Sequence, residues 1–375
     1  MAIISIQYWE VYVKIFKIVL TGGPCAGKTT AVSAVKEYLW SKGIPCLIVP
    51  ETATELLPNL IYQNIPDIYN FQTMVMKRQL GKERDTIDYA LNNLSNYDKC
   101  VIIYDRGIFD NIAYLNSHDD FNKMLDSFCL SELDVLDGYD MVIDLLSLAT
   151  CKPEAYNLSN KARSEGVEEA AMLDKKTSMA WANHHNLKLV SSEVSLEEET
   201  KIITDLIDNL INEKDETIMT EYDIDIDNSD FERYNQMDGL YVTEHYFDMD
   251  SDQYQCVVYT RGNLNDMSYV LVLYKKIGNK KVIVLNEVID SNTFGTLCRK
   301  IKYLGGTRKR EVNFIENKTF YRLNIYDDRA TLEVQKNTSG KEAIIPSDII
   351  ISENKKSNII DNDSKKIAYI KKLIK

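Results

Sequence analysis

The sequence predicts a mixed α/β protein in two parts: a parallel β-sheet with helices on both faces, followed by an antiparallel β domain. Short apolar runs alternate with helical patterns over roughly the first 213 residues, which is typical of parallel sheets. Beyond them, β-rich runs are separated by Gly-, Asn- and Asp-rich turns, which is typical of antiparallel sheets. At 375 residues the chain is also long for a single core.

The expected strands of the first part are short, apolar and rich in β-branched residues, as buried parallel strands are. They are Ile15–Leu20, Cys46–Val49, Cys100–Tyr104, Met141–Leu145 and Leu187–Val190. Helical patterns occupy Thr29–Lys42, Tyr69–Asn93, Asp119–Leu133, Val167–His184 and Leu196–Glu213. Because helices connect successive strands, we expect them to cover both faces of the sheet.

The β domain is expected to follow an acidic, Asp-rich linker. The predicted boundaries are 1–213 for the first domain, 214–231 for the linker, 232–350 for the β domain and 351–375 for a tail with a helix at Ser364–Ile374. The expected strands are Gly239–Phe247, Tyr254–Arg261, Tyr269–Lys276, Lys281–Val288, Glu311–Ile315, Thr319–Asp327 and Ala330–Lys336, with one helix at Asn292–Leu304. We expect these strands to form an antiparallel β domain of the α+β class that is closed or strongly curved.

Composition and charge disfavour several classes of protein. No run approaches the ~20 apolar residues that cross a membrane, and seven scattered cysteines suit reduced thiols in a cytoplasmic protein. The net charge is −13, but residues 1–231 carry 20 Lys and Arg against 38 Asp and Glu, so the remainder is basic. Nucleic acid is therefore not favoured as a partner of the first part, whereas the second part is the better candidate to bind a polyanion.

The strongest functional signal is the loop between the first expected strand and the first expected helix. Its sequence, Gly22-Gly23-Pro24-Cys25-Ala26-Gly27-Lys28-Thr29-Thr30, fits G-x-x-x-x-G-K-[ST]. Glycines let backbone N–H groups turn toward phosphate oxygens, and the helix N-terminus adds its dipole. Lys28 is expected to contact the β- and γ-phosphates, and Thr29 to ligate Mg²⁺. The loop therefore predicts binding of ATP or GTP with Mg²⁺.

Three charged residues follow neighbouring strands of the predicted sheet. Asp105 and Arg106 end one strand, and Glu51 follows another in Leu47–Thr52. Asp105 is expected to hold the metal or its water, or else to cap a helix. Arg106 is expected to contact a phosphate or a substrate group, or to pair with Asp105. Glu51 is placed to act as a base for a hydroxyl or water, with a helix-cap role equally open.

Three further residues are weaker candidates. Gln72 and Arg78 lie on the next predicted helix, where they could line a pocket for a phosphoryl acceptor. Arg163 lies in the polar loop Asn157–Gly166, where a lid would supply a cation for transition-state charge. We include Arg163 with Lys28, Glu51, Asp105 and Arg106 among the candidate catalytic residues.

Taken together, the first part resembles one P-loop family, the AAA-type ATP/GTP-binding domains related to the ribosylnicotinamide-kinase half of NadR. The resemblance rests on Gly22–Thr30, Pro50-Glu51, Asp105-Arg106-Gly107 and the segment Asn160–His184. It covers residues 14–213 and implies a kinase-like P-loop fold with the Pro-Glu and Asp-Arg-Gly positions facing the active centre. The aromatic or Asn base contact expected after the last strand is not evident at Val190–Glu193, so the resemblance does not separate ATP from GTP.

The second part resembles the CYTH domains, which are triphosphate-tunnel folds with a barrel interior lined by Lys, Arg and Glu. The resemblance rests on Arg261, Tyr269–Lys276, Glu287, Phe294, Lys309-Arg310, Tyr321–Tyr326 and Leu332-Glu333. It implies a polyanion site made of Arg261, Lys275, Lys309, Arg310, Arg322, Glu287 and Glu333. Inward-pointing basic groups on alternating strands would converge on one phosphate chain.

One departure from the CYTH pattern bears on the reaction. The metal-binding E-x-E-x-K run of that family is reduced here to Glu244 in Tyr241–Tyr246. This favours a binding module over a triphosphatase. A P-loop domain followed by such a barrel resembles the TRPL-translocation-defect type of protein, which implies binding of GTP and of phosphoinositide head groups.

Three functions are consistent with the sequence. The first is a slow NTP-hydrolysing regulator whose barrel binds a phosphate-rich ligand: a phosphoinositide, polyphosphate or nucleotide. The second is a kinase that phosphorylates a nucleoside-like hydroxyl with Glu51 as base. The third is a triphosphatase that works in the barrel. A kinase acting alone does not need a basic β domain, and the reduced E-x-E-x-K run disfavours the third, so we expect the first.

Overall fold

The computed structural model describes residues 13–56, 67–156, 166–212, 219–262, 266–277 and 280–357, with the side chains of 277, 280–287 and 353–357 excepted. The chain divides into two compact units. The first unit comprises Met1–Phe128 and Tyr139–Ile211, and the second comprises Cys129–Gly138 and Asn212–Lys375. Within the described ranges, no helix combines the length and the apolar character needed to span a bilayer.

The first unit is a five-stranded parallel sheet with the strand order β2-β3-β1-β4-β5. Its strands are β1 (Lys14–Thr21), β2 (Cys46–Val49), β3 (Lys99–Asp105), β4 (Met141–Leu145) and β5 (Leu187–Val190). Its helices are α1 (Lys28–Ser41), α2 (Thr52–Leu56), α3 (Ile68–Asn93), η2 (Ile108–Tyr114), α4 (His118–Ser127), α6 (Leu148–Cys151), η3 (Pro153–Ala155), α7 (Val167–Ala180) and α8 (Leu196–Ile211). The α/β prediction for this part is confirmed.

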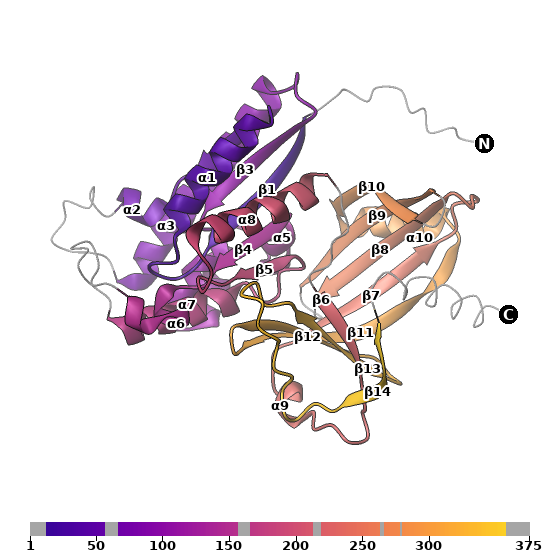
Figure 1. Cartoon of the computed structure of the whole chain (residues 1–375). Coiled ribbons are helices and arrows are strands. Elements are labelled where there is room, and N and C mark those ends of the chain that lie inside the picture. The colour runs from indigo at the N-terminus through magenta and orange to yellow at the C-terminus, as the bar shows by residue number, and fades with distance from the viewer. Residues whose placement is uncertain are drawn as a thin grey trace. The chain divides into compact units, whose positions relative to one another are not determined.

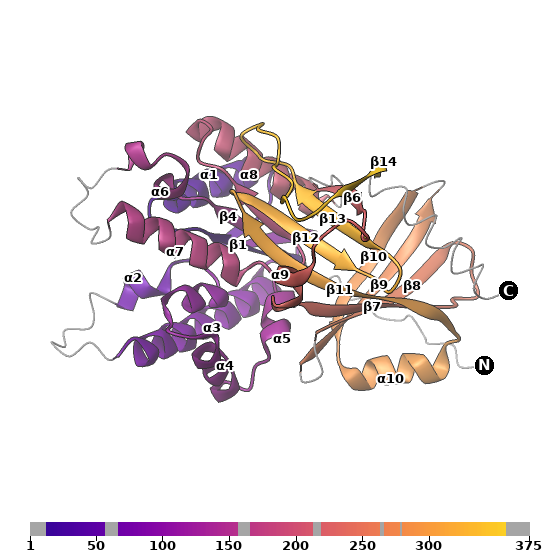
Figure 2. The ribbon, with the colours of Figure 1, turned by 90° about the horizontal axis from the view of Figure 1, so that it is seen from below.

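The central strands of this unit are buried on both faces, which explains their unbroken apolar sequences. Cys100, Val101, Ile102 and Ile103 of β3 have no exposed surface. Helices α1 and α8 cover one face of the sheet, and α3 and α7 cover the other (Figures 1 and 2). Because β1 lies between β3 and β4, the carboxyl ends of these three strands meet next to the loop that follows β1.

One helical prediction in this region was wrong in extent. The stretch Asp119–Leu133 forms not one helix but α4 and then α5 (Glu132–Asp137). Two local features separate them: Cys129 adopts a positive φ of 56°, and the Ser131 side chain accepts from the Asp134 N–H as the N-cap of α5. The break matters because α5 belongs to the second unit.

The second unit is a nine-stranded sheet with the order β10-β9-β8-β7-β11-β12-β13-β6-β14. Its strands are β6 (Met219–Ile224), β7 (Leu240–Phe247), β8 (Tyr254–Gly262), β9 (Met267–Ile277), β10 (Lys280–Ile289), β11 (Tyr303–Glu316), β12 (Thr319–Ile325), β13 (Ala330–Gln335) and β14 (Ile351–Ser357), all paired antiparallel. Its helices besides α5 are α9 (Glu232–Asn235) and α10 (Ser291–Lys300).

The antiparallel prediction is confirmed, but the closed barrel is a correction. In the described part of the chain, β10 and β14 are the two edges of an open sheet and do not pair with each other. Two strands also lie outside the predicted β domain. β6 falls within the expected linker 214–231, and β14 falls at the start of the expected tail. The predicted helix at 364–374 lies outside the described residues.

The two faces of this sheet differ in chemistry. One face carries apolar side chains. Helix α10 covers this face over β7–β9, and α9 together with the segment before β14 covers it over β11–β13. Figure 2 shows α10 lying along one side of the sheet. The other face carries the charged side chains of β8, β11, β12 and β13, described below. Side chains alternate between the two faces along each strand. The pairing register of the strands therefore fixes which residues share a face.

Candidate functional site

The loop at Gly22–Thr30 connects β1 directly to α1 and has the shape of a phosphate cradle. Gly22 has a φ of 139°, and a Cβ there would lie 2.2 Å from the carbonyl oxygen of Leu145, so only glycine fits. Gly27, the N-cap of α1, has a left-handed φ of 79° and no side-chain cap. The N-terminal N–H groups of α1 are therefore directed at the loop, as an anion site requires.

Lys28 lies inside this loop. Its ammonium donates to the carbonyl oxygens of Gly22 and Gly23, at 2.8 and 2.9 Å. Burial, and then the charge of Arg106, lower the pKa of Lys28 to about 8. Phosphate oxygens next to this nitrogen would favour its charged form, because an anion raises the pKa of a neighbouring cation.

A buried carboxylate that the sequence did not single out braces the loop from behind. Asp174 of α7 is 1% exposed and accepts from the Gly23 N–H at 2.8 Å and the Ser147 N–H at 3.0 Å. Thr150 donates to its second oxygen at 2.5 Å, and the Ser147 hydroxyl donates to the Pro24 carbonyl. Asp174 therefore fixes the first half of the loop to the turn after β4. The sequence did contain a signal for this role, because Asp174 lies on the buried side of α7 between Ala170 and Ser178, where an acidic residue is unusual.

A second buried carboxylate, Asp144, lies beside it. Asp144 stands opposite Thr21 in the β1–β4 register and has no exposed surface. Neither of its oxygens has a hydrogen-bond partner among the described residues. Burial, reinforced by the neighbouring charge of Asp174, raises the pKa of Asp144 well above its usual range. Burial therefore favours the neutral form of the Asp144 carboxyl group.

The predicted acidic and basic residues meet at the ends of β2 and β3. Arg106, with a φ of 70°, donates from Nε to Glu51 at 2.7 Å and from Nη1 to Asp110 at 3.2 Å. Arg106 therefore pairs with Glu51 and Asp110 rather than with Asp105. Asp110 also accepts from the Gly107 N–H at 2.7 Å and from the Thr21 hydroxyl, so it ties η2 to β1.

The pKa values of Glu51 and Asp105 shift in opposite directions at this place. Burial alone would raise the pKa of Glu51, but Arg106 and the Thr54 hydroxyl hold it below its ordinary value. Burial and the nearby charge of Glu51 raise the pKa of Asp105. The Oδ1 atom of Asp105 is buried and has no hydrogen-bond partner among the described residues. An orphaned carboxylate oxygen at this place is suited to a cation or its water ligand.

Acidic groups outnumber basic ones around Lys28, which bears on the metal. Among the described residues, the carboxyl groups of Glu51, Asp105, Asp110, Asp144 and Asp174 interact electrostatically with Lys28, and so does the Arg106 guanidinium. In the described ranges, no three His, Cys, Asp or Glu side chains converge into a metal site of their own. The assignment of Thr29 and Asp105 as the protein ligands of Mg²⁺ stays a prediction of the sequence.

The weaker candidates have mixed outcomes. Arg163 and the loop around it lie outside the described residues. Arg78 pairs with Glu55 at 2.9 Å on an exposed surface, and Gln72 is buried on α3. Gln79, which the sequence reasoning missed, accepts from Thr52 at 2.5 Å and donates to the Arg106 carbonyl at 3.3 Å. It therefore links α2 and α3 to the turn that carries Arg106.

In the second unit, four predicted polyanion residues share the charged face. Lys309 and Arg261 flank Val242 from its two neighbouring strands, and Arg322 stands opposite Glu333. Arg322 contacts Glu333 at 3.3 Å and Glu311 at 3.4 Å, and Lys309 contacts Glu311 at 3.3 Å. Burial alone would raise the pKa of Glu311, but Arg322 and Lys309 hold it well below its usual range. We call Arg261, Lys309, Glu311, Arg322 and Glu333 the charged cluster.

Two predicted polyanion residues lie on the other face. Lys275 pairs with Tyr254 and lies on the same face of β9 as the apolar Leu271 and Leu273. Arg310 neighbours Lys309 but projects to the opposite face, where it donates to the carbonyls of Tyr234 and Met237 at 3.1 and 2.6 Å. Those hydrogen bonds pair carbonyl oxygens at the C-terminal end of α9, so Arg310 has a structural role. The side chain of Glu287 lies outside the described part.

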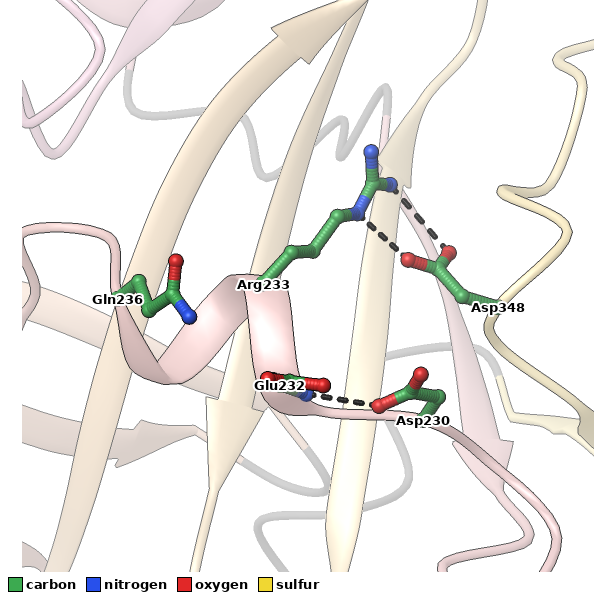
Figure 3. Close-up of a pocket in the computed structure, with 5 residues that line it drawn as sticks. All are labelled: Asp230, Glu232, Arg233, Gln236 and Asp348. Carbon is green, nitrogen blue, oxygen red and sulfur yellow. Dashed lines mark hydrogen bonds and ion pairs between the residues drawn. The ribbon is translucent and has the colours of Figure 1, made fainter.

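A hollow lies beside α9 in the second unit (Figure 3). It is lined by Asp230, Glu232, Arg233, Gln236 and Asp348. Arg233 pairs with Asp348 at 2.5 Å and with Glu316 at 3.0 Å, and its guanidinium lies over the Tyr234 ring. These contacts hold the segment before β14 against the sheet. Arg233, the cation that lines this hollow, therefore has a structural role.

Comparison with known proteins supports the prediction of a nucleotide-binding fold for the first unit. Residues 17–198 match the model of a protein family described as an AAA domain. The match runs from β1 into α8 and includes the loop, Glu51, Asp105 and Asp174. A search of curated proteins gives no match to the chain. The parallel sheet, the loop geometry and this match together define the first unit as a P-loop nucleotide-binding domain.

Proposed function

We propose that the first unit binds ATP or GTP with Mg²⁺ and hydrolyses it slowly. The observation that carries this proposal is the position of Lys28, whose partly buried ammonium is held by two loop carbonyls beside the N-terminus of α1. Such a nitrogen can turn from the carbonyls to phosphate oxygens without leaving the loop. The orphaned oxygen of Asp105 supports a magnesium ion at the same edge of the sheet.

The residues of the site would share the work as follows. The loop N–H groups and Lys28 bind and orient the β- and γ-phosphates, while Asp174 keeps the loop in shape. Mg²⁺, held by Thr29 and Asp105, would neutralise charge on the phosphates when bound. Glu51, ionised because Arg106 lowers its pKa, would orient water or accept its proton. Arg163 would supply a further cation from the segment 157–166.

Nucleotide turnover by a loop variant tests this proposal. Lys28→Ala is expected to lower Mg-dependent phosphate release from ATP and GTP by about a hundredfold or more, since one charged contact to the transition state is lost. Lys36→Ala on the same helix, outside the loop, is the matched control and should keep full turnover. Unchanged turnover in Lys28→Ala would refute the proposal.

A kinase reaction is a second candidate because of the placement of Glu51. Its carboxylate lies at the end of β2, is 30% exposed and is ionised, as a base for an acceptor hydroxyl must be. This alternative requires ADP or GDP formation that rises when a nucleoside is added and collapses in Glu51→Gln. Hydrolysis that is indifferent to added nucleosides supports the first proposal instead.

We also propose that the charged face of the second unit binds a phosphate-rich ligand: a polyphosphate, a nucleotide or a phosphoinositide head group. The support is that three cations share one face of the sheet: Arg261 is buried, and the side chains of Lys309 and Arg322 are 15% and 16% exposed. Buried ion pairs contribute little net stability because desolvation offsets their attraction, so such a cluster is better explained by binding. The acids of the cluster are already paired, which does not favour the triphosphatase alternative.

Titration of tripolyphosphate into the full chain carrying Lys28→Ala tests this second proposal, because the loop is then disabled. Adding Lys309→Gln should weaken binding about tenfold or more, since a buried charge pair with the ligand is lost. Arg310→Gln is a matched control: the neighbouring residue faces the other way and should leave the affinity unchanged. Equal effects of the two substitutions would contradict the proposed face.

A further inference from the structure

A short segment from the first half of the sequence is built into the second unit. Cys129–Gly138 lies between α4 and β4 in the chain but clusters with the residues after 211. Its helix α5 contacts β9. Next to that strand, the Leu133 N–H donates to Asp266 at 3.3 Å, and the Leu133 side chain lies against Gly262 at the end of β8. Leu133 and Leu136 are both buried. The segment is therefore docked on the sheet, not a free loop.

The last residue of α5 places a carboxylate on the charged face. Asp137 accepts from Nη1 of Arg261 at 2.5 Å and from the hydroxyl of Ser268. Arg261 and Ser268 stand directly opposite each other on β8 and β9. The side chains of Arg261 and Asp137 are 7% and 3% exposed, so this pair is almost fully withdrawn from water. A guanidinium and a hydroxyl around one anionic group are also the donors that bind a phosphate.

This ion pair differs in origin from the others of the charged cluster. Lys309 and Arg322 take the partners Glu311 and Glu333 from the sheet itself, where the strand register holds them. Asp137 instead reaches Arg261 from a separate ten-residue segment, 129–138, which forms no strand pair with the sheet. Among these acids, Asp137 is thus the one that a competing anion could replace at the lowest structural cost.

We propose that Arg261 and Ser268 form an anion subsite that Asp137 closes from within the chain, so that a phosphate-rich ligand must displace Asp137 to bind there. This inference rests on the polyanion site proposed above and adds its regulation. The chain supplies its own carboxylate as an internal competitor. It also keeps Arg261 paired, since a buried guanidinium without an anion would carry a large desolvation cost.

Calorimetric titration of tripolyphosphate into the full chain tests the inference, again in the Lys28→Ala background. Asp137→Asn removes the competing charge but keeps an acceptor for Ser268, and it should tighten binding about tenfold or more. Asp134→Asn, an exposed acid on the same helix, should leave the affinity unchanged. Arg261→Gln should weaken binding in both the Asp137 and the Asp137→Asn backgrounds.

The possible outcomes separate the two proposals. Binding that is equal or weaker in Asp137→Asn overturns the internal competitor while the polyanion site stands. Absence of binding in every variant overturns the polyanion site and this inference with it. Should Asp137→Asn fail to fold, hydrogen exchange in the Lys28→Ala chain decides. Backbone amides of Val135–Gly138 should exchange faster when tripolyphosphate is bound, and unchanged exchange with bound tripolyphosphate overturns the inference.

Discussion

Glu83 makes a measurable prediction about how stability depends on pH. It lies on α3, accepting from Gln79 at 2.9 Å and from the Tyr139 hydroxyl at 3.0 Å. Burial raises its pKa from the ordinary 4.5 to about 7, despite these hydrogen bonds. Between these two values the folded chain holds a proton that the unfolded chain releases, so stability is lost as pH rises through this window. At roughly 1.4 kcal/mol per pH unit, the loss is about 3 kcal/mol.

Glu83→Gln should remove this loss because the amide does not titrate. We expect the unfolding free energy of Glu83→Gln, relative to the unmodified chain, to rise by roughly 2 to 3 kcal/mol from about pH 5 to about pH 7.5. Urea denaturation at each pH measures it, followed by tryptophan fluorescence, since Trp181 is buried and packs against Tyr139. Asp85→Asn, 73% exposed on the same helix, is the control and should give a flat difference. A flat difference for Glu83→Gln as well would refute the burial argument.

Two further predictions concern the packing behind the loop. Asp174→Ala should weaken nucleotide binding about tenfold or more, because the Gly23 N–H and the Ser147 N–H both lose the oxygen that accepts from them. Unchanged affinity in a titration with MgATP and MgGTP would contradict the bracing role. Gly107→Ala should destabilise the chain by about 1–3 kcal/mol, since its Cβ would lie 2.7 Å from the buried Trp181 ring. Gly81→Ala, with open space around it on α3, should instead stabilise by roughly 0.5–1 kcal/mol, and denaturation of both variants checks the contrast.

Much of the first unit could be predicted because its signals are local. Buried parallel strands need unbroken apolar runs, and the ranges of β2, β4 and β5 agree with the sequence prediction residue for residue. The phosphate loop needs glycines, a lysine and a following helix in fixed order, so its motif is readable without a structure. The break between α4 and α5 was missed because its cause is one left-handed residue, Cys129, which the helical period does not reveal.

The supporting residues of the candidate site were not predictable in the same way. Asp174 reaches Gly23 across 151 positions of the chain, and Asp137 reaches Arg261 across 124. No local pattern encodes such pairs, because they arise from how separate elements pack. An acidic residue among apolar neighbours, as at Asp144 in β4, signals a buried role but not its partner.

The division between sequence and structure is clearest at Lys309 and Arg310. The sequence by itself determined the two fold classes, the phosphate loop and the presence of a basic pair, because spacing and residue type carry those properties. Neighbouring residues of a strand must project to opposite faces, so only one of the pair could join a common site. The tertiary structure alone decided that Lys309 lies on the face of the charged cluster and that the sheet stays open, because strand register and edge pairing depend on contacts between distant strands.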